Sequence, residues 1–270
     1  MIRNILSMFG IVAALSPCLL ATNEPTMEPS TYQQIAACLF VGGQPVFGEN
    51  VYFQTTVNTG SGYHSHYVDR PKGSFYTWTG NDSGQATTGG DGCAYIYWYA
   101  PQASGGHDIL ATSTIGGSSS FHIMVWTNSS AAMSELAASA DYSLVGSTGD
   151  HPYNHFGTST AIWGIQNMMA DFRQMTGVVA QVNDMSLGWG GTFDLGPAYA
   201  GSTCPVDAAQ YWTNSCVHAE HRIGRNADIP YAGLGGYNST FITVANQYGG
   251  GSGAGGILPE GNHYHLRSNF

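Results

Sequence analysis

Hydrophobic and polar residues alternate along short segments in the first half of the chain, which is the pattern of strands with one buried face. These segments are rich in β-branched and aromatic residues, and glycine-rich turns such as residues 88–92 separate them. Strands are predicted at residues 51–57, 93–101, 107–114 and 121–126. Several short strands with turns between them predict an all-β sandwich over residues 33–127.

The hydrophobic period changes after residue 128. Apolar residues recur at steps of three and four from residue 158 to 176, which predicts an amphipathic helix. Thr158 or Ser159 is suited to cap its start, and Gly177 to end it. A strand at 178–183, a shorter helix capped by Asn238 and Ser239, and a final strand at 262–268 follow. Mixed helices and strands predict a second, α+β domain over residues 130–270.

The N-terminus has the features of an export signal. Arg3 precedes an apolar run at 11–21 that is too short to span a bilayer, so a signal peptide is predicted at residues 1–22. Its removal leaves no transmembrane segment in the mature chain. Cys18 follows a proline and only partly fits a lipid-attachment motif, so a lipid anchor is the alternative. Residues 23–32 contain two prolines and few apolar residues, which predicts a linker.

The charge composition narrows the function classes. Charged residues make up 9% of the chain against about a quarter in most globular proteins, the formal net charge is -10, and Lys72 is the only lysine. Nucleic-acid binding needs a basic surface that neutralises phosphates, so it is excluded. A neutral, glycine-rich composition behind an export signal predicts a secreted, periplasmic or cell-surface protein.

Four cysteines remain after the predicted signal, which suggests two disulfides in an exported chain. Three pairings are possible. We favour Cys38–Cys93 with Cys204–Cys216, because each bond then lies inside one predicted domain. The alternative is that the cysteines are buried free thiols.

Two groups of histidines near the C-terminus carry the candidate chemistry. The first is His218-Ala-Glu-His221-Arg-Ile-Gly224, followed by Asp228, and the second is His263-Tyr-His265. Gly224 allows a tight turn that can aim His221 and Asp228 at one point. His263 and His265 are two residues apart on a predicted strand, so they face the same side. Zinc binds neutral imidazole and carboxylate groups, so these residues are candidate ligands.

The two motifs resemble those of the lysostaphin, D-Ala-D-Ala peptidase and hedgehog superfamily, and are most similar to penicillin-insensitive murein endopeptidases. The resemblance implies an α+β zinc peptidase domain with an antiparallel sheet. It implies that His221, Asp228 and His265 bind Zn²⁺, that His263 is the catalytic histidine, and that His218 is an accessory active-site residue. The implied substrate is a peptide or peptidoglycan, cleaved by a metal-activated water with His263 as general acid or base.

Two alternatives stay open. The carboxypeptidase branch of the superfamily uses Glu-x-x-His, which Glu260-Gly-Asn-His263 also matches; Glu260 would then be the base and His263 a zinc ligand. The other alternative is a secreted binding protein, in which zinc has only a structural role and the β domain binds a partner. The segment Tyr99-Ala100-Pro101 and the strands after it resemble bacterial immunoglobulin-like modules, so the β domain is predicted to be immunoglobulin-like.

Overall fold

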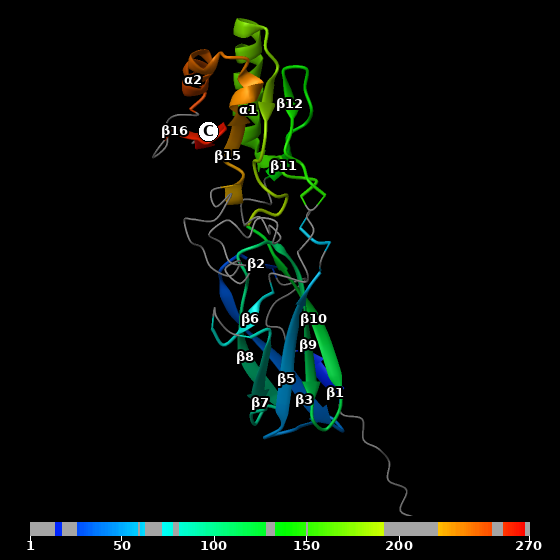
Figure 1. Cartoon of the computed structure of the whole chain (residues 1–270). Helices are drawn as coiled ribbons and strands as arrows, with labels where there is room; N and C mark the ends of the chain where they lie inside the picture. The colour runs from blue at the N-terminus through cyan, green and yellow to red at the C-terminus, as the bar shows by residue number, and fades with distance from the viewer. Residues whose placement is uncertain are drawn as a thin grey trace, which may run out of the picture.

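The protein is mostly β-structure, with two α-helices in the described part of the chain (Figure 1). The computed structural model describes residues 14–17, 26–58, 60–62, 72–77, 81–127, 133–149, 151–191, 221–249 and 256–267. The prediction of a β-rich fold is confirmed. No helix among these residues is both long and apolar enough to cross a membrane.

Two five-stranded sheets form the first half of the described chain. One has the order β1-β3-β8-β6, with β4 paired to β3, and the other has the order β2-β10-β9-β5-β7. The first sheet consists of β1 (Ala14–Pro17), β3 (Tyr32–Val41), β4 (Gln44–Pro45), β6 (Ser74–Phe75) and β8 (Cys93–Tyr99). The second consists of β2 (Thr26–Met27), β5 (Asn50–Val57), β7 (Ser83–Thr87), β9 (Gly105–Ser113) and β10 (Ser118–Val125).

The buried faces of the two sheets share one hydrophobic cluster. Along β5 the residues alternate, so that Val51 and Phe53 are buried while Tyr52 is exposed. In β8, Ile96 and Trp98 point into the same cluster. Fully burying a large apolar side chain contributes about 1.5–3 kcal/mol, so this alternation drives the two sheets together. The strands predicted from the pattern correspond to β5, β8, β9 and β10.

The predicted linker is wrong at residues 26–27. This short segment forms β2, which pairs in parallel with β10, and Met27 is buried in the shared cluster. A two-residue strand is too short to produce a readable alternation. The predicted signal peptide also contributes a strand, because β1 pairs antiparallel with β3. Its removal stays a prediction, and Cys18 lies outside the described residues.

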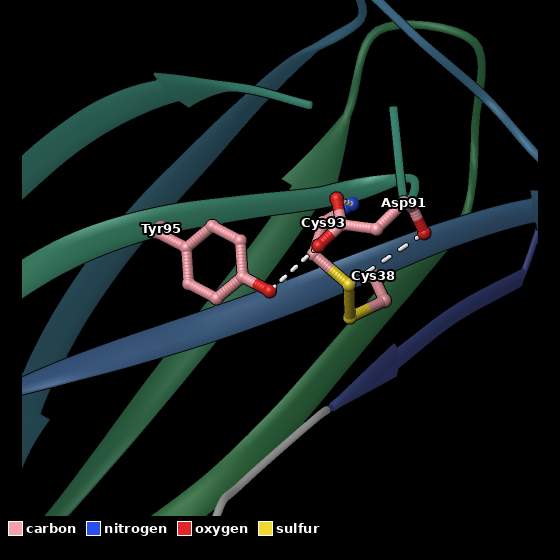
Figure 2. The surroundings of a disulfide bond; sticks show 4 residues. All are labelled: Cys38, Asp91, Cys93 and Tyr95. Carbon is pink, nitrogen blue, oxygen red and sulfur yellow. Dashed lines mark hydrogen bonds between the residues drawn. A yellow bond between two sulfur atoms is a disulfide. The ribbon is translucent and has the colours of Figure 1, made fainter. Parts of the chain in front are cut away.

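Cys38 and Cys93 form a disulfide, as predicted. They are directly opposite each other on the neighbouring strands β3 and β8. This bond therefore lies within one sheet, whereas the conserved disulfide of antibody domains joins two sheets. Figure 2 shows how Asp91 organises the turn: it accepts hydrogen bonds from the Cys93 backbone N–H and the Tyr95 hydroxyl, which lower its pKa. Cys204 and Cys216 lie outside the described residues.

The second half combines helices with short strands around its own hydrophobic cluster. Strands β11 and β13 pair antiparallel, β12 and β14 pair parallel, and β15, β17 and β16 form an antiparallel sheet in that order. The elements are β11 (Met133–Glu135), β12 (Tyr142–Leu144), β13 (Phe156–Thr158), α1 (Ser159–Thr176), β14 (Ala180–Val182), β15 (Asn226–Pro230), α2 (Asn238–Gln247), β16 (Ile257–Glu260) and β17 (His263–Arg267).

Helix α1 begins and ends where the sequence predicts. The Thr158 hydroxyl accepts a hydrogen bond from the Ala161 N–H, and Gly177 ends the helix with φ 73°. The periodic residues Ile165, Met168 and Phe172 are buried. In contrast, Asn238 and Ser239 do not cap α2; they are its first residues, after Tyr237, which makes no side-chain cap.

The segment 189–191 connects the two halves through backbone and hydroxyl contacts. The Ser104 hydroxyl donates to the Gly190 carbonyl at 2.6 Å, and the Thr127 N–H donates to the Trp189 carbonyl at 3.0 Å. Gly191 bridges to Ala103 and donates its N–H to the Arg222 carbonyl. Through this segment the end of the first half is connected to Arg222, which follows His221.

Removing the disulfide is expected to destabilise the protein. The bond closes a loop with a sequence separation of 55, and closing such a loop stabilises a fold by about 4 kcal/mol through the unfolded state. Denaturant titration of a C38S/C93S variant should show a loss of that order. An unchanged midpoint would show that this bond, which joins β3 to β8, does not stabilise the fold.

Candidate metal centre

Strand pairing sets Asp228 against His265. In the antiparallel pair β15–β17 these two residues are direct partners in the register. The His265 Nδ1 atom lies 2.8 Å from Asp228 Oδ1. Direct partners in an antiparallel sheet project to the same face, so this pairing brings a carboxylate and an imidazole together by backbone geometry.

The neighbouring residues on both strands hold this face in place. Ala227, Ile229 and Leu266 project to the opposite side and are buried in the second hydrophobic cluster. Tyr264 stacks on the Phe241 ring of α2 with ring centroids 5.7 Å apart. A one-residue slip in register would expose these apolar side chains, so the core fixes which face carries Asp228 and His265.

A short 3₁₀ helix, residues 221–223, supplies the third side chain. Its His221 Nδ1–H donates to the Met185 carbonyl at 2.6 Å, which directs Nε2 towards Asp228 Oδ1 at 3.3 Å. Gly224 follows with φ 68°, the left-handed conformation that the predicted turn requires. A carbonyl that fixes the orientation of a ligating imidazole is a frequent feature of metal sites.

The three side chains are almost completely buried. His221, Asp228 and His265 have exposed fractions of 1%, 2% and 4%. Burial alone would raise the pKa of Asp228, but the His221 and His265 imidazoles hold it far below its ordinary value. Burial alone would lower the pKa of His221, but the Asp228 carboxylate outweighs it and the pKa is raised. The site therefore stabilises positive charge next to a buried carboxylate.

The donor set fits a tetrahedral metal. One ligand atom from each of His221, Asp228 and His265 lies within 4.8 Å of the other two. Two ligands about 2.0–2.1 Å from zinc at tetrahedral angles are about 3.3 Å apart. The separation of 3.3 Å between His221 Nε2 and Asp228 Oδ1 matches this value, and the 2.8 Å between His265 Nδ1 and Asp228 Oδ1 is shorter.

His263 and Glu260 lie at the edge of the three-residue group. The His263 Nε2 atom is 3.5 Å from Asp228 Oδ1 and 3.6 Å from Glu260 Oε2. The side chain of His263 is 22% exposed and that of Glu260 is 50% exposed, in contrast to the buried triad. His263 pairs with Glu260 across β16–β17. An imidazole in this position contacts both the buried carboxylate and solvent.

The structure brings together five of the six residues named from the sequence. The sixth, His218, lies outside the described residues. The sequence did not indicate the Met185 carbonyl that orients His221, because every residue has a backbone carbonyl and its role cannot be read from the residue type. The sequence also did not indicate how Asp184 supports β15: the Asp184 carbonyl accepts from the Asp228 N–H at 3.0 Å. The Asp184 carboxylate in turn accepts hydrogen bonds from the Asn154 and Asn183 side chains.

No protein-family model and no curated protein matches the chain. Among solved structures, domains 4 and 5 of the S-layer protein SbsC match 42% of the chain with 12% identity and a TM-score of 0.27. The chain spans about half of that structure, 53%. A Bacteroides thetaiotaomicron lipoprotein matches 46% of this chain over 84% of its own length, with 9% identity and a TM-score of 0.26.

A conjugative transposon lipoprotein from Bacteroides eggerthii DSM 20697 matches 43% of this chain over 97% of its own length. Its identity is 8% and its TM-score 0.25. Similarities this low carry no argument about fold or function.

Replacing Gly224 is expected to disturb the site. An added Cβ would lie 2.3 Å from the Met133 Sδ atom and 3.0 Å from the Gly157 Cα atom, in a backbone conformation that alanine disfavours. The left-handed strain and the overpacking together predict a loss of about 2–4 kcal/mol for Gly224→Ala, with weaker metal binding. Thermal unfolding and metal titration measure the two effects.

Gly236→Ala is the matched control. Gly236 also has positive φ, at 87°, but an added Cβ would meet no atom within 4 Å. It should lose only the backbone part, about 1–2 kcal/mol, and keep its metal affinity. Equal losses in the two variants would show that the close packing of Gly224 does not matter.

Proposed function

We propose that the protein is a zinc-dependent peptidase that acts outside the cytoplasm on cell-wall peptides. The observation that carries the proposal is the buried set of His221, Asp228 and His265 with the partly exposed His263 at its edge. Two imidazoles and one carboxylate are the ligand set of many catalytic zinc sites, which keep one coordination position for water or substrate.

The chemistry of the donors favours zinc over calcium and magnesium. Calcium and magnesium prefer sites built from oxygen ligands, and this set has a single carboxylate. Structural zinc sites usually have four protein ligands, often cysteines. Among the residues that the structure describes, the buried set has three ligands, His221, Asp228 and His265, which supports a catalytic rather than a structural ion.

The chain's own residues support a proton-transfer role next to the metal. When bound, zinc supplies a Lewis acid that polarises a peptide carbonyl and activates a water molecule at neutral pH. His263 is in position to take a proton from the attacking water and to return it to the leaving amine. Its Nδ1 atom is 3.0 Å from the Asn262 side-chain oxygen, which orients the ring so that Nε2 faces the site. Arg222, within the 3₁₀ helix, and Arg225, two residues after its end, are candidates to bind a substrate carboxylate.

The structure favours His265 as the zinc ligand over the alternative, in which His263 is the ligand. His265 is 4% exposed and touches Asp228 at 2.8 Å, whereas the side chain of His263 is 22% exposed and Nε2 lies 3.5 Å away. Ligands are normally the more buried members of such a cluster, because the acid or base must also reach the substrate. In the alternative register, Glu260 is the base and His263 replaces His265.

The substrate class and the location rest on the sequence. The two histidine motifs resemble those of murein endopeptidases, which act on peptidoglycan peptides. The Cys38–Cys93 disulfide supports an oxidising compartment, because such bonds are rare in the cytosol. Together they favour a secreted, periplasmic or cell-surface peptidase. A two-domain arrangement, with an immunoglobulin-like module before an α+β peptidase domain, is part of this proposal.

One observation favours a second candidate, a binding protein with a structural zinc. His263 Nε2 is close enough to Asp228 Oδ1, at 3.5 Å, to become a fourth ligand after a small rotation. Four protein ligands would leave no position for water, and the site would then be inert. Metal content of a His263 variant separates the two functions.

Single alanine variants of the ligands should lose zinc, while His263→Ala keeps it. Removing His221, Asp228 or His265 should weaken zinc binding by more than about 100-fold, beyond the range typical of residues that only support ligands. His263→Ala should bind one zinc per chain and lose about 100-fold or more in rate. Atomic emission measures the metal, and mass spectrometry of peptides released from murein measures the rate.

His122→Ala is the control for the histidine variants. His122 is also partly exposed and pairs with a carboxylate, Asp108, at 2.8 Å, but it lies on β10 in the first half. It should change neither metal content nor rate.

Loss of zinc in His263→Ala together with retention in His265→Ala would establish the alternative assignment, with His263 as the ligand. Glu260→Gln should then abolish the rate. An active-site role fails altogether if the zinc-loaded protein releases nothing from murein.

A further inference from the structure

The outer face of the second sheet carries a surface depression far along the chain from the histidine motifs. Its volume is about 570 Å³. The lining side chains come from the three adjacent strands β7, β5 and β9 and from Tyr76, which follows β6. None of the residues that line it carries a formal charge. Figure 1 shows these three strands side by side in the part of the molecule below β2.

Strand register arranges these side chains in two rows. Gln85, Tyr52 and Thr112 are partners across the three strands and form one row. Ser83, Gln54 and Leu110 are partners two residues further along and form the other. Neighbouring strands are about 4.8 Å apart and successive outward residues about 7 Å apart, so the rows make a platform of about 10 by 7 Å.

Tyr76 forms a wall beside this platform, held by hydrogen bonds. Its hydroxyl accepts from the Gln85 backbone N–H at 2.5 Å and donates to the Gln85 carbonyl. Gln85 lies on β7, which is the last strand of its sheet. The hydroxyl therefore satisfies the backbone N–H and carbonyl of Gln85, to which an additional peptide strand would otherwise hydrogen-bond at the edge of the sheet. The ring stays 52% exposed and is left in a fixed position.

The chemistry of the lining selects one class of ligand. Tyr52 is 44% exposed and Tyr76 is 52% exposed, and their ring faces attract weakly positive C–H groups. The amides of Gln54 and Gln85 and the Thr112 hydroxyl both donate and accept hydrogen bonds. An anionic ligand would find no cation in the lining, and a purely apolar one would leave the amides unpaired. Neutral sugars present C–H faces and hydroxyl groups together.

We propose that this depression binds a neutral oligosaccharide, with Tyr52 and Tyr76 stacking on sugar rings and Gln54, Gln85 and Thr112 bonding their hydroxyl groups. The site is independent of the metal centre, and the failure of either proposal leaves the other intact. Binding sites of this kind combine apolar and aromatic surface with a few polar groups that fix orientation.

Calorimetric titration of the full-length protein with cellohexaose and with chitohexaose tests the proposal. At least one of these neutral hexasaccharides should bind with a stoichiometry of one. Tyr52→Ala should weaken that binding at least about tenfold, the scale of an aromatic anchor at a binding site. Gln54→Ala, which changes an exposed side chain with little risk to folding, should weaken it severalfold.

Tyr95→Ala is the matched control. Tyr95 is likewise 44% exposed and projects outward in the middle of a strand, β8, but that strand belongs to the other sheet. It should keep wild-type affinity. Absence of binding by both hexasaccharides at millimolar concentration overturns the proposal, as does loss of binding in Tyr95→Ala with retention in Tyr52→Ala and Gln54→Ala.

Discussion

The buried carboxylate of Asp228 is the constraint on which the second half of the structure depends. A lone charge in this environment would be strongly unfavourable, so it must be paired or must bind a metal. Strand β17 supplies His265 directly opposite, and the 3₁₀ helix supplies His221. The chain therefore places two imidazoles against one carboxylate, an arrangement that a metal ion can stabilise further by replacing protons.

The apolar side of the same strands makes this arrangement rigid. Ile229 and Leu266 are anchored in the cluster that α1 and α2 cover, while Asp228 and His265 occupy the other face. The hydrogen bond from the Asp228 N–H to the Asp184 carbonyl ties β15 to the segment after β14. A metal site gains from such support, because ligands held in place before binding lose little conformational entropy when the ion arrives.

The first half uses its two faces differently. Its inner faces share a hydrophobic cluster, whereas its outer faces expose tyrosines such as Tyr52 and Tyr95. Tyr52 lies in the depression of the second sheet, whereas Tyr95 lies on the other sheet, outside that depression. The segment 189–191 contacts the end of this half near Ser104 and Thr127, and Gly191 also donates its N–H to the carbonyl of Arg222, next to His221.

Periodicity along the sequence was enough to predict α1 with both of its caps and the strands β5, β8, β9 and β10, because these are local properties of backbone and burial; it did not predict β3, the longest described strand. The spacing of His221, Gly224, Asp228, His263 and His265 likewise predicted a metal site. The hydrophobic pattern could not predict β2, because a two-residue strand is too short to show a period. It also could not predict that α2 has no side-chain cap. Tertiary structure alone decided that Asp228 faces His265, that Met185 orients His221, and that Tyr76 closes the edge of β7. These features depend on strand register and on contacts between residues distant in sequence, which the local order of amino acids does not encode in a readable form.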